Sequence, residues 1–261
     1  MKSYLFLFIW GMVLSGWTVS NELSQQNPGS DTNGDSLLNG IQQKIQTAFR
    51  LSIRTDNPQS LRALYRELET AKYVKRYDWA LYWQSYSALY LSIYYLKKGD
   101  RKSATRETQK AIRILKQKTA KNSEDYALLA WIQGISMSFQ GAKAMFIAQE
   151  MHQNIRQALR LDSTNIRAYY VYASTDYHTP EKYGGGRKCE KLLLKAISLP
   201  ARKERKPYLP SWGKVESYDL LIRCYLRKQQ PALARKYYNE AIQQFPRNKM
   251  LHTWAEKLSM E

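Results

Sequence analysis

The chain has little of several features that mark common protein classes. It has only 2 Cys in 261 residues, so at most one disulfide is possible and a Cys-rich zinc module is excluded. Its 12 Gly and 8 Pro are too few for a collagen-like chain, and its 44% apolar content is too high for a wholly disordered one. Acidic residues are also scarce, since 22 Asp and Glu stand against 41 Lys and Arg, a formal charge of +19.

Long apolar runs are absent except at the start of the chain. In residues 1–20, Lys2 precedes an apolar stretch, and Thr18 and Ser20 are small residues at the −3 and −1 positions of a cut. This pattern predicts a signal peptide cleaved after about Ser20, and hence a secreted protein, periplasmic or extracellular. An uncleaved anchor is the alternative, but the stretch is shorter than the ~20 residues of a spanning helix. With no Cys near the cut, the chain is not predicted to be a lipoprotein.

The rest of the chain divides into a leader and one long helical region. Residues 21–36 are rich in Asn, Ser, Gly, Gln and Asp, which predicts a flexible leader. From 37 to 261 apolar residues recur every three or four positions, which predicts a single all-α domain. The expected helices form five antiparallel pairs and a closing helix: 37–55 with 58–74, 77–98 with 100–118, 123–142 with 146–161, 164–178 with 186–198, 213–228 with 231–245, and 248–259.

A repeated pattern of small and aromatic residues runs through these pairs. The clearest copy has Tyr218, Leu221, Ile222 and Tyr225 on its first helix and Ala234, Tyr238, Ala241 and Pro246 on its second. Alanines seven positions apart share one helical face and allow a close helix–helix approach. The same spacing recurs at Ala104 and Ala111, and again between Cys189 and Ala196. The pattern resembles the tetratricopeptide repeat and predicts a helical-hairpin α-solenoid, abbreviated TPR-like.

The segment Tyr177 to Ile197, with Thr179, Pro180 and three consecutive glycines, carries a closer resemblance. Together with Trp212 and the repeat at 218–246, it resembles a family of secreted tetratricopeptide-repeat-like proteins of Bacteroidetes, over roughly residues 37–255. More distantly, the chain is similar to the T-component of periplasmic TRAP-type transporters. The resemblance implies an exported helical-repeat protein and no particular activity. The chain departs from the family at Cys189, where members often have Ala, and in its strong positive charge.

Residue patterns typical of catalysis or metal binding are weak. The three histidines, His152, His178 and His252, are scattered and form no helical metal motif. Residues 184–188 (GGGRK) open a helix and could bind phosphate, but they lack the P-loop spacing, and a turn that uses glycine is the alternative. We therefore predict no catalytic residues, no metal, no cofactor and no enzymatic activity.

The two cysteines fall on neighbouring predicted helices. Cys189 lies on the second helix of one pair and Cys224 on the first helix of the next, so they could approach each other. A disulfide and a pair of small buried side chains both remain open at this point.

Positive charge concentrates in two segments. Residues 97–122 contain ten basic and two acidic residues, a charge of +8. A second segment carries the candidate polyanion-contacting residues Arg202, Lys203, Arg205 and Lys206. Such surfaces attract polyanions or an anionic membrane surface, while a solvated helix face and a loop are the alternative. No nucleic-acid-binding motif accompanies the charge, so no specific nucleic-acid partner is predicted.

By analogy with repeat geometry, some side chains on the first helices face a concave groove. These candidates are Tyr86, Leu89, Ile93, Arg167, Tyr170, Ser174, Glu216, Asp219 and Arg223. Leu89 and Ile93, being apolar, could equally pack against a neighbouring helix. The sequence thus favours a binding scaffold for a peptide or protein partner in the cell envelope. A periplasmic solute-binding or transporter-accessory component is the alternative, and it would need an enclosed apolar pocket.

Overall fold

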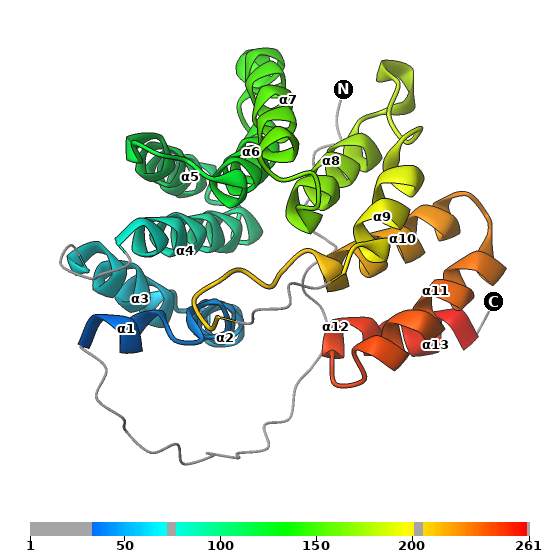
Figure 1. Cartoon of the computed structure of the whole chain (residues 1–261), viewed down its shortest axis with the longest axis horizontal. Coiled ribbons are helices and arrows are strands. Elements are labelled where there is room, and N and C mark those ends of the chain that lie inside the picture. Colours follow the sequence, from blue (N-terminus) through cyan, green and yellow to red (C-terminus); the bar gives the residue numbers. More distant parts are fainter. Residues whose placement is uncertain (1–32, 72–76, 201–205, 260–261) are drawn as a thin grey trace. The chain divides into compact units, whose positions relative to one another are not determined.

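The computed structural model describes residues 33–71, 77–200 and 206–259. In these ranges the regular elements are helices, with no β-strand, as the sequence predicts (Figure 1). The chain divides into two compact units. In the described residues, the N-terminal unit comprises 33–71, 77–121 and 206–210, and the C-terminal unit comprises 122–200 and 211–259. The predicted signal peptide and most of the leader lie outside the described residues.

The N-terminal unit contains two helical hairpins. Its helices are α1 (Asn33–Leu38), α2 (Ile41–Thr55), α3 (Gln59–Thr70), α4 (Tyr77–Lys97) and α5 (Arg101–Gln117). Helix α2 packs on α3, and α4 packs on α5 and α3. The predicted helix 37–55 is interrupted at Gly40, whose φ of 63° is a left-handed conformation that separates α1 from α2.

Two serines show why α4 and α5 approach closely. The hydroxyl of Ser85 donates to the carbonyl of Ala111 at 2.9 Å, and that of Ser92 donates to the carbonyl of Ala104 at 3.0 Å. The serines are seven residues apart, and so are the alanines, so the two bonds fix an antiparallel pair. All four side chains are fully buried, which confirms that these alanines pack between helices.

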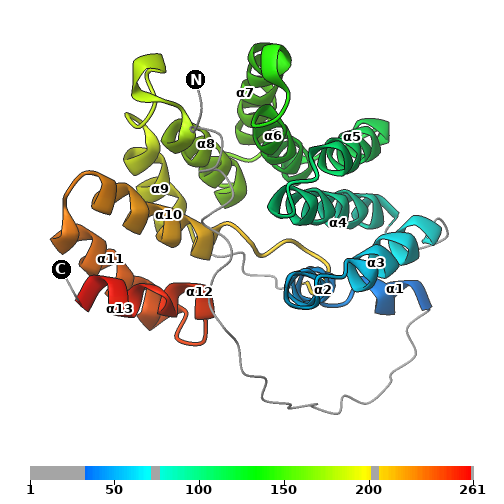
Figure 2. The ribbon, with the colours of Figure 1, turned by 180° about the vertical axis from the view of Figure 1, so that it is seen from behind.

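The C-terminal unit contains three hairpins and two short closing helices. Its elements are α6 (Ser123–Met137), η1 (Gly141–Lys143), α7 (Ala144–Leu161), α8 (Ile166–His178), η2 (Glu181–Tyr183), α9 (Cys189–Ser198), α10 (Lys214–Arg227), α11 (Pro231–Gln244), α12 (Lys249–His252) and α13 (Trp254–Ser259). The hairpins are α6–α7, α8–α9 and α10–α11, which pack along their lengths (Figures 1 and 2). The single closing helix expected at 248–259 is instead divided at Thr253.

The repeat residues of this unit form its core. Tyr218, Leu221, Ala234 and Ala241 are all fully buried, because α11 lies against α10 along the alanine face. Ile222, at the position that the repeat reserves for a small residue, is also fully buried. The hairpins and their register are therefore as predicted, while their stacking into one solenoid stays a prediction.

None of the helices in the described ranges combines the length and apolar character needed to cross a bilayer.

Candidate functional site

An open pocket of about 340 Å³ lies on the N-terminal unit. Its walls come from α3 and α5, and Leu91 of α4 contributes an apolar lining group. We call it the cationic pocket, because four of its eight lining residues are basic and two are acidic: Arg62, Tyr65, Arg66, Glu69, Leu91, Arg106, Glu107 and Lys110.

Glu107 organises the basic side of this pocket. Its side chain is only 6% exposed, and it accepts hydrogen bonds from Arg106 Nε at 3.3 Å and Lys110 Nζ at 3.2 Å. Lys110 also lies over the ring of Tyr65, with Nζ 5.7 Å from the ring centre. The buried carboxylate thus holds two cations in place through one side chain, while Arg106 keeps more than half of its surface exposed to solvent.

Arg62 and Tyr65, both partly exposed, complete the α3 side. Arg62 donates a hydrogen bond to the Tyr95 hydroxyl. Burial, together with the charges of Glu69 and Glu107, raises the pKa of Tyr65, so its hydroxyl remains a hydrogen-bond donor at neutral pH. The pocket therefore combines cations, a hydroxyl and an apolar wall, which suits a carboxylate or another small anionic group.

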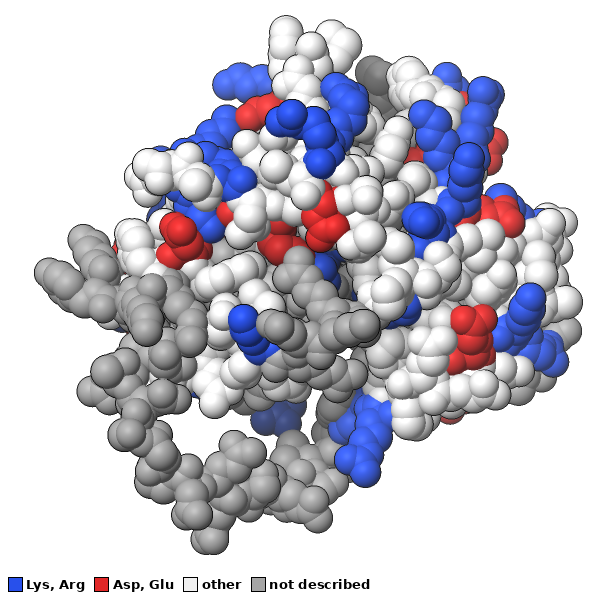
Figure 3. Space-filling model, in the orientation of Figure 1, with Lys and Arg blue, Asp and Glu red and all other residues white. Residues whose placement is uncertain are grey.

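The predicted polyanion-contacting loop is described only at its end. Arg202, Lys203 and Arg205 lie outside the described residues, and Lys206 is exposed in the N-terminal unit. Basic side chains elsewhere gather in several separate groups with acidic ones between them, on the face drawn in Figure 3. The positive charge on this face is therefore distributed and is not gathered in one patch.

The groove candidates of α4 lie in the core of the N-terminal unit. Tyr86 and Leu89 are fully buried and Ile93 is 4% exposed. The Tyr86 hydroxyl shares a hydrogen bond of 3.0 Å with that of Tyr90 and accepts one of 3.4 Å from Gln46. Leu89 and Ile93 are therefore packed in the core and do not line a groove, which is the alternative stated for these two residues.

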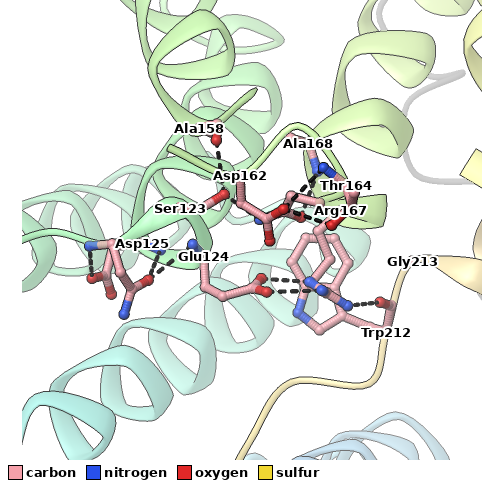
Figure 4. A network of polar contacts seen from close by, with 12 residues as sticks. Ser123, Glu124, Asp125, Ala158, Asp162, Thr164, Arg167, Ala168, Trp212 and Gly213 are labelled. Atoms are coloured by element: carbon pink, nitrogen blue, oxygen red, sulfur yellow. Dashed lines mark hydrogen bonds and ion pairs between the residues drawn. The ribbon is translucent and has the colours of Figure 1, made fainter. Parts of the chain in front are cut away.

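The groove candidates of α8 are also buried, around an ion pair that the sequence did not indicate. Arg167 donates through Nε and Nη2 to both carboxylate oxygens of Glu124, and through Nη1 to the carbonyl of Trp212 at 3.1 Å (Figure 4). The side chains of Arg167 and Glu124 are 6% and 2% exposed. The contact joins α6, α8 and the segment before α10.

An aromatic cluster adjoins this ion pair through Trp212, whose carbonyl accepts from Arg167. The rings of Trp131 and Trp212 lie 4.6 Å apart, and Tyr170 contacts both edge to face. Ser174 lies one turn further along α8, near the ring of His178. Sequence reasoning missed Trp131 and Glu124, because groove positions were assigned only on the clearer repeat copies and α6 belongs to a weaker one.

The groove candidates of α10 make their own polar contacts. Asp219 accepts a hydrogen bond from the Trp254 indole at 2.8 Å and pairs with Arg223. The Arg223 guanidinium lies over the Trp254 ring, 4.8 Å from its centre. The Glu216 carboxylate caps α10 by accepting from the Gly213 amide at 2.6 Å, and burial of this carboxylate raises its pKa. Asp219 and Arg223 thus hold α10 to Trp254, the first residue of α13, while Glu216 stabilises the start of α10 itself.

The three-glycine turn between α8 and α9 has a structural reason at each glycine. Gly184 and Gly186 have φ of 83° and 79°, which other residues rarely adopt. A Cβ on Gly185 would lie 1.9 Å from the Thr179 carbonyl oxygen. The amides of Lys188 and Cys189 both donate to the Asp176 carboxylate at 2.8 Å, so a carboxylate of the chain occupies the position that a phosphate would take. The structure therefore favours the turn over the phosphate site.

The histidines make local contacts. His178 Nδ1 lies 2.7 Å from the Ser174 carbonyl oxygen, and His252 Nε2 lies 2.7 Å from that of Pro246. His152 packs edge to face on Tyr172. Within the described ranges, no group of three or more His, Cys, Asp or Glu side chains is placed to hold a metal ion.

Comparisons with protein-family models, with curated proteins and with solved structures give no match for this chain.

Proposed function

We propose that this chain is an exported, non-enzymatic binding protein that engages a peptide or protein partner in the cell envelope, and that the cationic pocket receives an acidic group of that partner. The observation that carries the proposal is the pocket itself, with four cations around an open hollow of about 340 Å³. A hollow of this size accepts a side chain or a chain terminus.

The chemistry of the lining favours binding through charge and hydrogen bonds. Arg62, Arg66 and Arg106 carry guanidinium groups that bind carboxylates in a bidentate manner. Glu107 fixes Arg106 and Lys110 before any partner arrives, and such preorganisation lowers the entropy lost on binding. Tyr65, which is partly exposed, adds apolar surface for the rest of the partner's side chain.

Export to the periplasm or the extracellular space is proposed on the sequence of residues 1–20. It is tested by N-terminal sequencing of the protein recovered from the envelope or the medium, where we expect Asn21 as the first residue. Met1 on that material would contradict it.

A solute-binding or transporter-accessory role would be favoured by an enclosed apolar pocket. The cationic pocket is open and charged, so it favours a group presented by a larger partner. Capture from native envelope extract on the immobilised protein, followed by mass spectrometry, identifies the candidates.

The pocket is tested with a short fluorescent oligoglutamate peptide, with oligoglutamine as the reference. We expect only the acidic peptide to bind, and we expect binding to collapse as salt rises from about 0.1 M to about 1 M, since the Debye length falls from about 10 Å to about 3 Å. The variant Arg62→Gln/Arg66→Gln/Arg106→Gln should bind at least about tenfold more weakly.

The matched control removes the same charge elsewhere. Arg235, Lys236 and Arg247 are exposed residues of the C-terminal unit, and their triple Gln variant should bind like the wild type. Equal weakening by both triple variants would mean that net charge alone attracts the peptide. A quadruple Gln variant of Arg202, Lys203, Arg205 and Lys206 tests the basic loop in the same way.

A further inference from the structure

The two cysteines of the chain meet inside the C-terminal unit. Cys189 is the first residue of α9 and Cys224 lies on α10, and both are fully buried. Their sulfur atoms are 2.7 Å apart. Unbonded sulfur atoms do not normally approach so closely, and a disulfide bond is about 2.05 Å long. The two thiols are thus placed for a covalent bond with little further movement.

Contacts on both sides of the pair hold it in this position. On the α9 side, the Asp176 carboxylate binds the amides of Lys188 and Cys189 at 2.8 Å. Between the helices, Glu190 accepts a hydrogen bond from the Tyr225 hydroxyl at 3.1 Å and pairs with Lys228. Because Glu190 and Tyr225 directly follow the two cysteines, the approach of the sulfurs is set by the packing of α9 on α10.

The guanidinium of Arg227 on α10 adds a contact to α8, the helix that precedes α9. It donates to the Tyr177 carbonyl at 2.7 Å and lies 3.7 Å from the centre of the Tyr177 ring. The second half of α10 therefore makes several contacts with α8 and α9 that do not depend on sulfur chemistry. A bond between the cysteines would add to an interface that the chain already forms.

The two thiols differ in reactivity. A hydrogen bond from Cys224 lowers the pKa of Cys189, against opposing effects of burial and of the Asp176 charge. The first turn of a helix also favours a thiolate. The pKa of Cys224 is raised, by its hydrogen bond with Cys189 and by burial. In the packed arrangement Cys189 is therefore the more acidic thiol of the pair.

We propose that Cys189 and Cys224 are a modification site: they are oxidised to an intramolecular disulfide that links α9 to α10. The oxidant is a small-molecule or protein disulfide. One of the two cysteine thiolates attacks one sulfur of that disulfide, forming a mixed disulfide and releasing one thiol. As α9 packs on α10, the thiolate of the other cysteine attacks the sulfur of the first, which forms the Cys189–Cys224 bond and releases the second thiol. The chain loses two electrons and two protons, and the oxidant takes them up.

Two other uses of the pair fit less well. A structural zinc site takes four ligands, and the described residues contain no cluster of three or more His, Cys, Asp or Glu side chains for a metal. A reactive surface thiol would have to be accessible, whereas both cysteines are fully buried. Burial also sets the timing: the oxidant acts before α9 and α10 close, and the finished bond is then shielded from reductants.

Refolding tests the proposal without relying on export or on the proposed function. The reduced full chain is refolded with oxidised and reduced glutathione, denatured, and treated with a maleimide–polyethylene glycol reagent. We expect no adduct before reduction, two adducts after it, and an intact mass lower by two hydrogens than that of the dithiol. The oxidised protein should also melt about 10 °C above the reduced one.

Variants and a cellular sample provide the controls. Cys189→Ser and Cys224→Ser should each give one adduct without reduction, and Cys189→Ala/Cys224→Ala should melt at the same temperature with or without reductant. Because labelling is done in denaturant, the number of free thiols can be counted even in a variant that folds poorly. Protein expressed in an oxidising compartment should match the refolded material. Two free thiols, disulfide-linked dimers or stable glutathione adducts as the main product would each overturn the proposal.

Discussion

The guanidinium of Arg167 binds both carboxylate oxygens of Glu124, 43 positions earlier in the chain. The pair joins α6 to α8, and Arg167 also donates to the carbonyl of Trp212, whose ring lies 4.6 Å from that of Trp131. Charges at this depth lose their hydration, so each one depends on its partner.

Removing one member of this pair should therefore be costly. We expect Glu124→Gln and Arg167→Met each to lower the free energy of unfolding by about 3–5 kcal/mol, because a single buried charge is left behind. The double variant should lose less than the sum of the two. Urea unfolding of all four proteins gives the coupling energy. Strict additivity would mean that the two side chains do not stabilise each other.

Gly185 should tolerate alanine poorly. The new Cβ would lie 1.9 Å from the Thr179 carbonyl oxygen, so the turn must shift. We expect Gly185→Ala to lower the free energy of unfolding by about 3 kcal/mol or more. Gly134→Ala is the matched control, since there the Cβ would meet only Met151 Sδ at 3.4 Å. In helix α6 that change should be neutral or stabilising by up to about 1 kcal/mol. Thermal melts of the two variants compare them directly, and equal effects would contradict the geometry of the turn.

The alanine face of α11 should reject larger side chains. Ala234 and Ala241 are fully buried against α10, so Ala234→Leu or Ala241→Leu should lower the free energy of unfolding by about 1–3 kcal/mol. Ala232 is exposed on the same helix, and Ala232→Leu should change it by no more than about 0.5 kcal/mol. Circular dichroism melts measure all three. If the buried and exposed variants melt alike, the repeat register is wrong.

Stability should fall between neutral and mildly acidic pH because of His152. Burial and the charges of Arg156 and Lys188 lower its pKa from 6.5. As the pH falls through 6.5, the unfolded chain takes up a proton that the folded chain does not, so the folded state loses stability until the pH reaches the lower folded pKa.

His152→Phe keeps an aromatic ring against Tyr172 and removes the titration. Its melting temperature should therefore decrease less than that of the wild type as the pH falls from about 7 to about 5. Parallel pH profiles for the two proteins would show that another group is responsible.

The local parts of this structure were accessible from the sequence, and the long-range parts were not. Helix existence follows from apolar periodicity, and hairpin register follows from alanines such as Ala104 and Ala111. Gly40 and Thr253, where helices are divided, lie inside continuous periodic patterns, so nothing in the periodicity marks the interruption.

The candidate site was harder to predict for a physical reason. Tyr86, Arg167 and Asp219 were assigned to a groove by analogy, and the structure buries all three. Burial of a charged side chain depends on a partner such as Glu124, which is distant in sequence. The cationic pocket likewise needs α3 and α5 to meet, and charge counting along the chain gave only the basic character of α5.

The Asp176 carboxylate, which binds the first amides of α9 from α8, has a consequence for how this chain can vary. Hydrogen bonds hold both ends of the long α8–α9 turn. The Gly186 amide donates to the Asp176 carbonyl at 2.9 Å, and the Thr179 hydroxyl donates to the Thr175 carbonyl at 2.8 Å. The tip between these two ends is exposed to solvent, and Tyr183 in it is 72% exposed. Residues inserted next to Tyr183 would lengthen the tip without changing the register of the hairpin, so this position suits an epitope tag or a fluorophore.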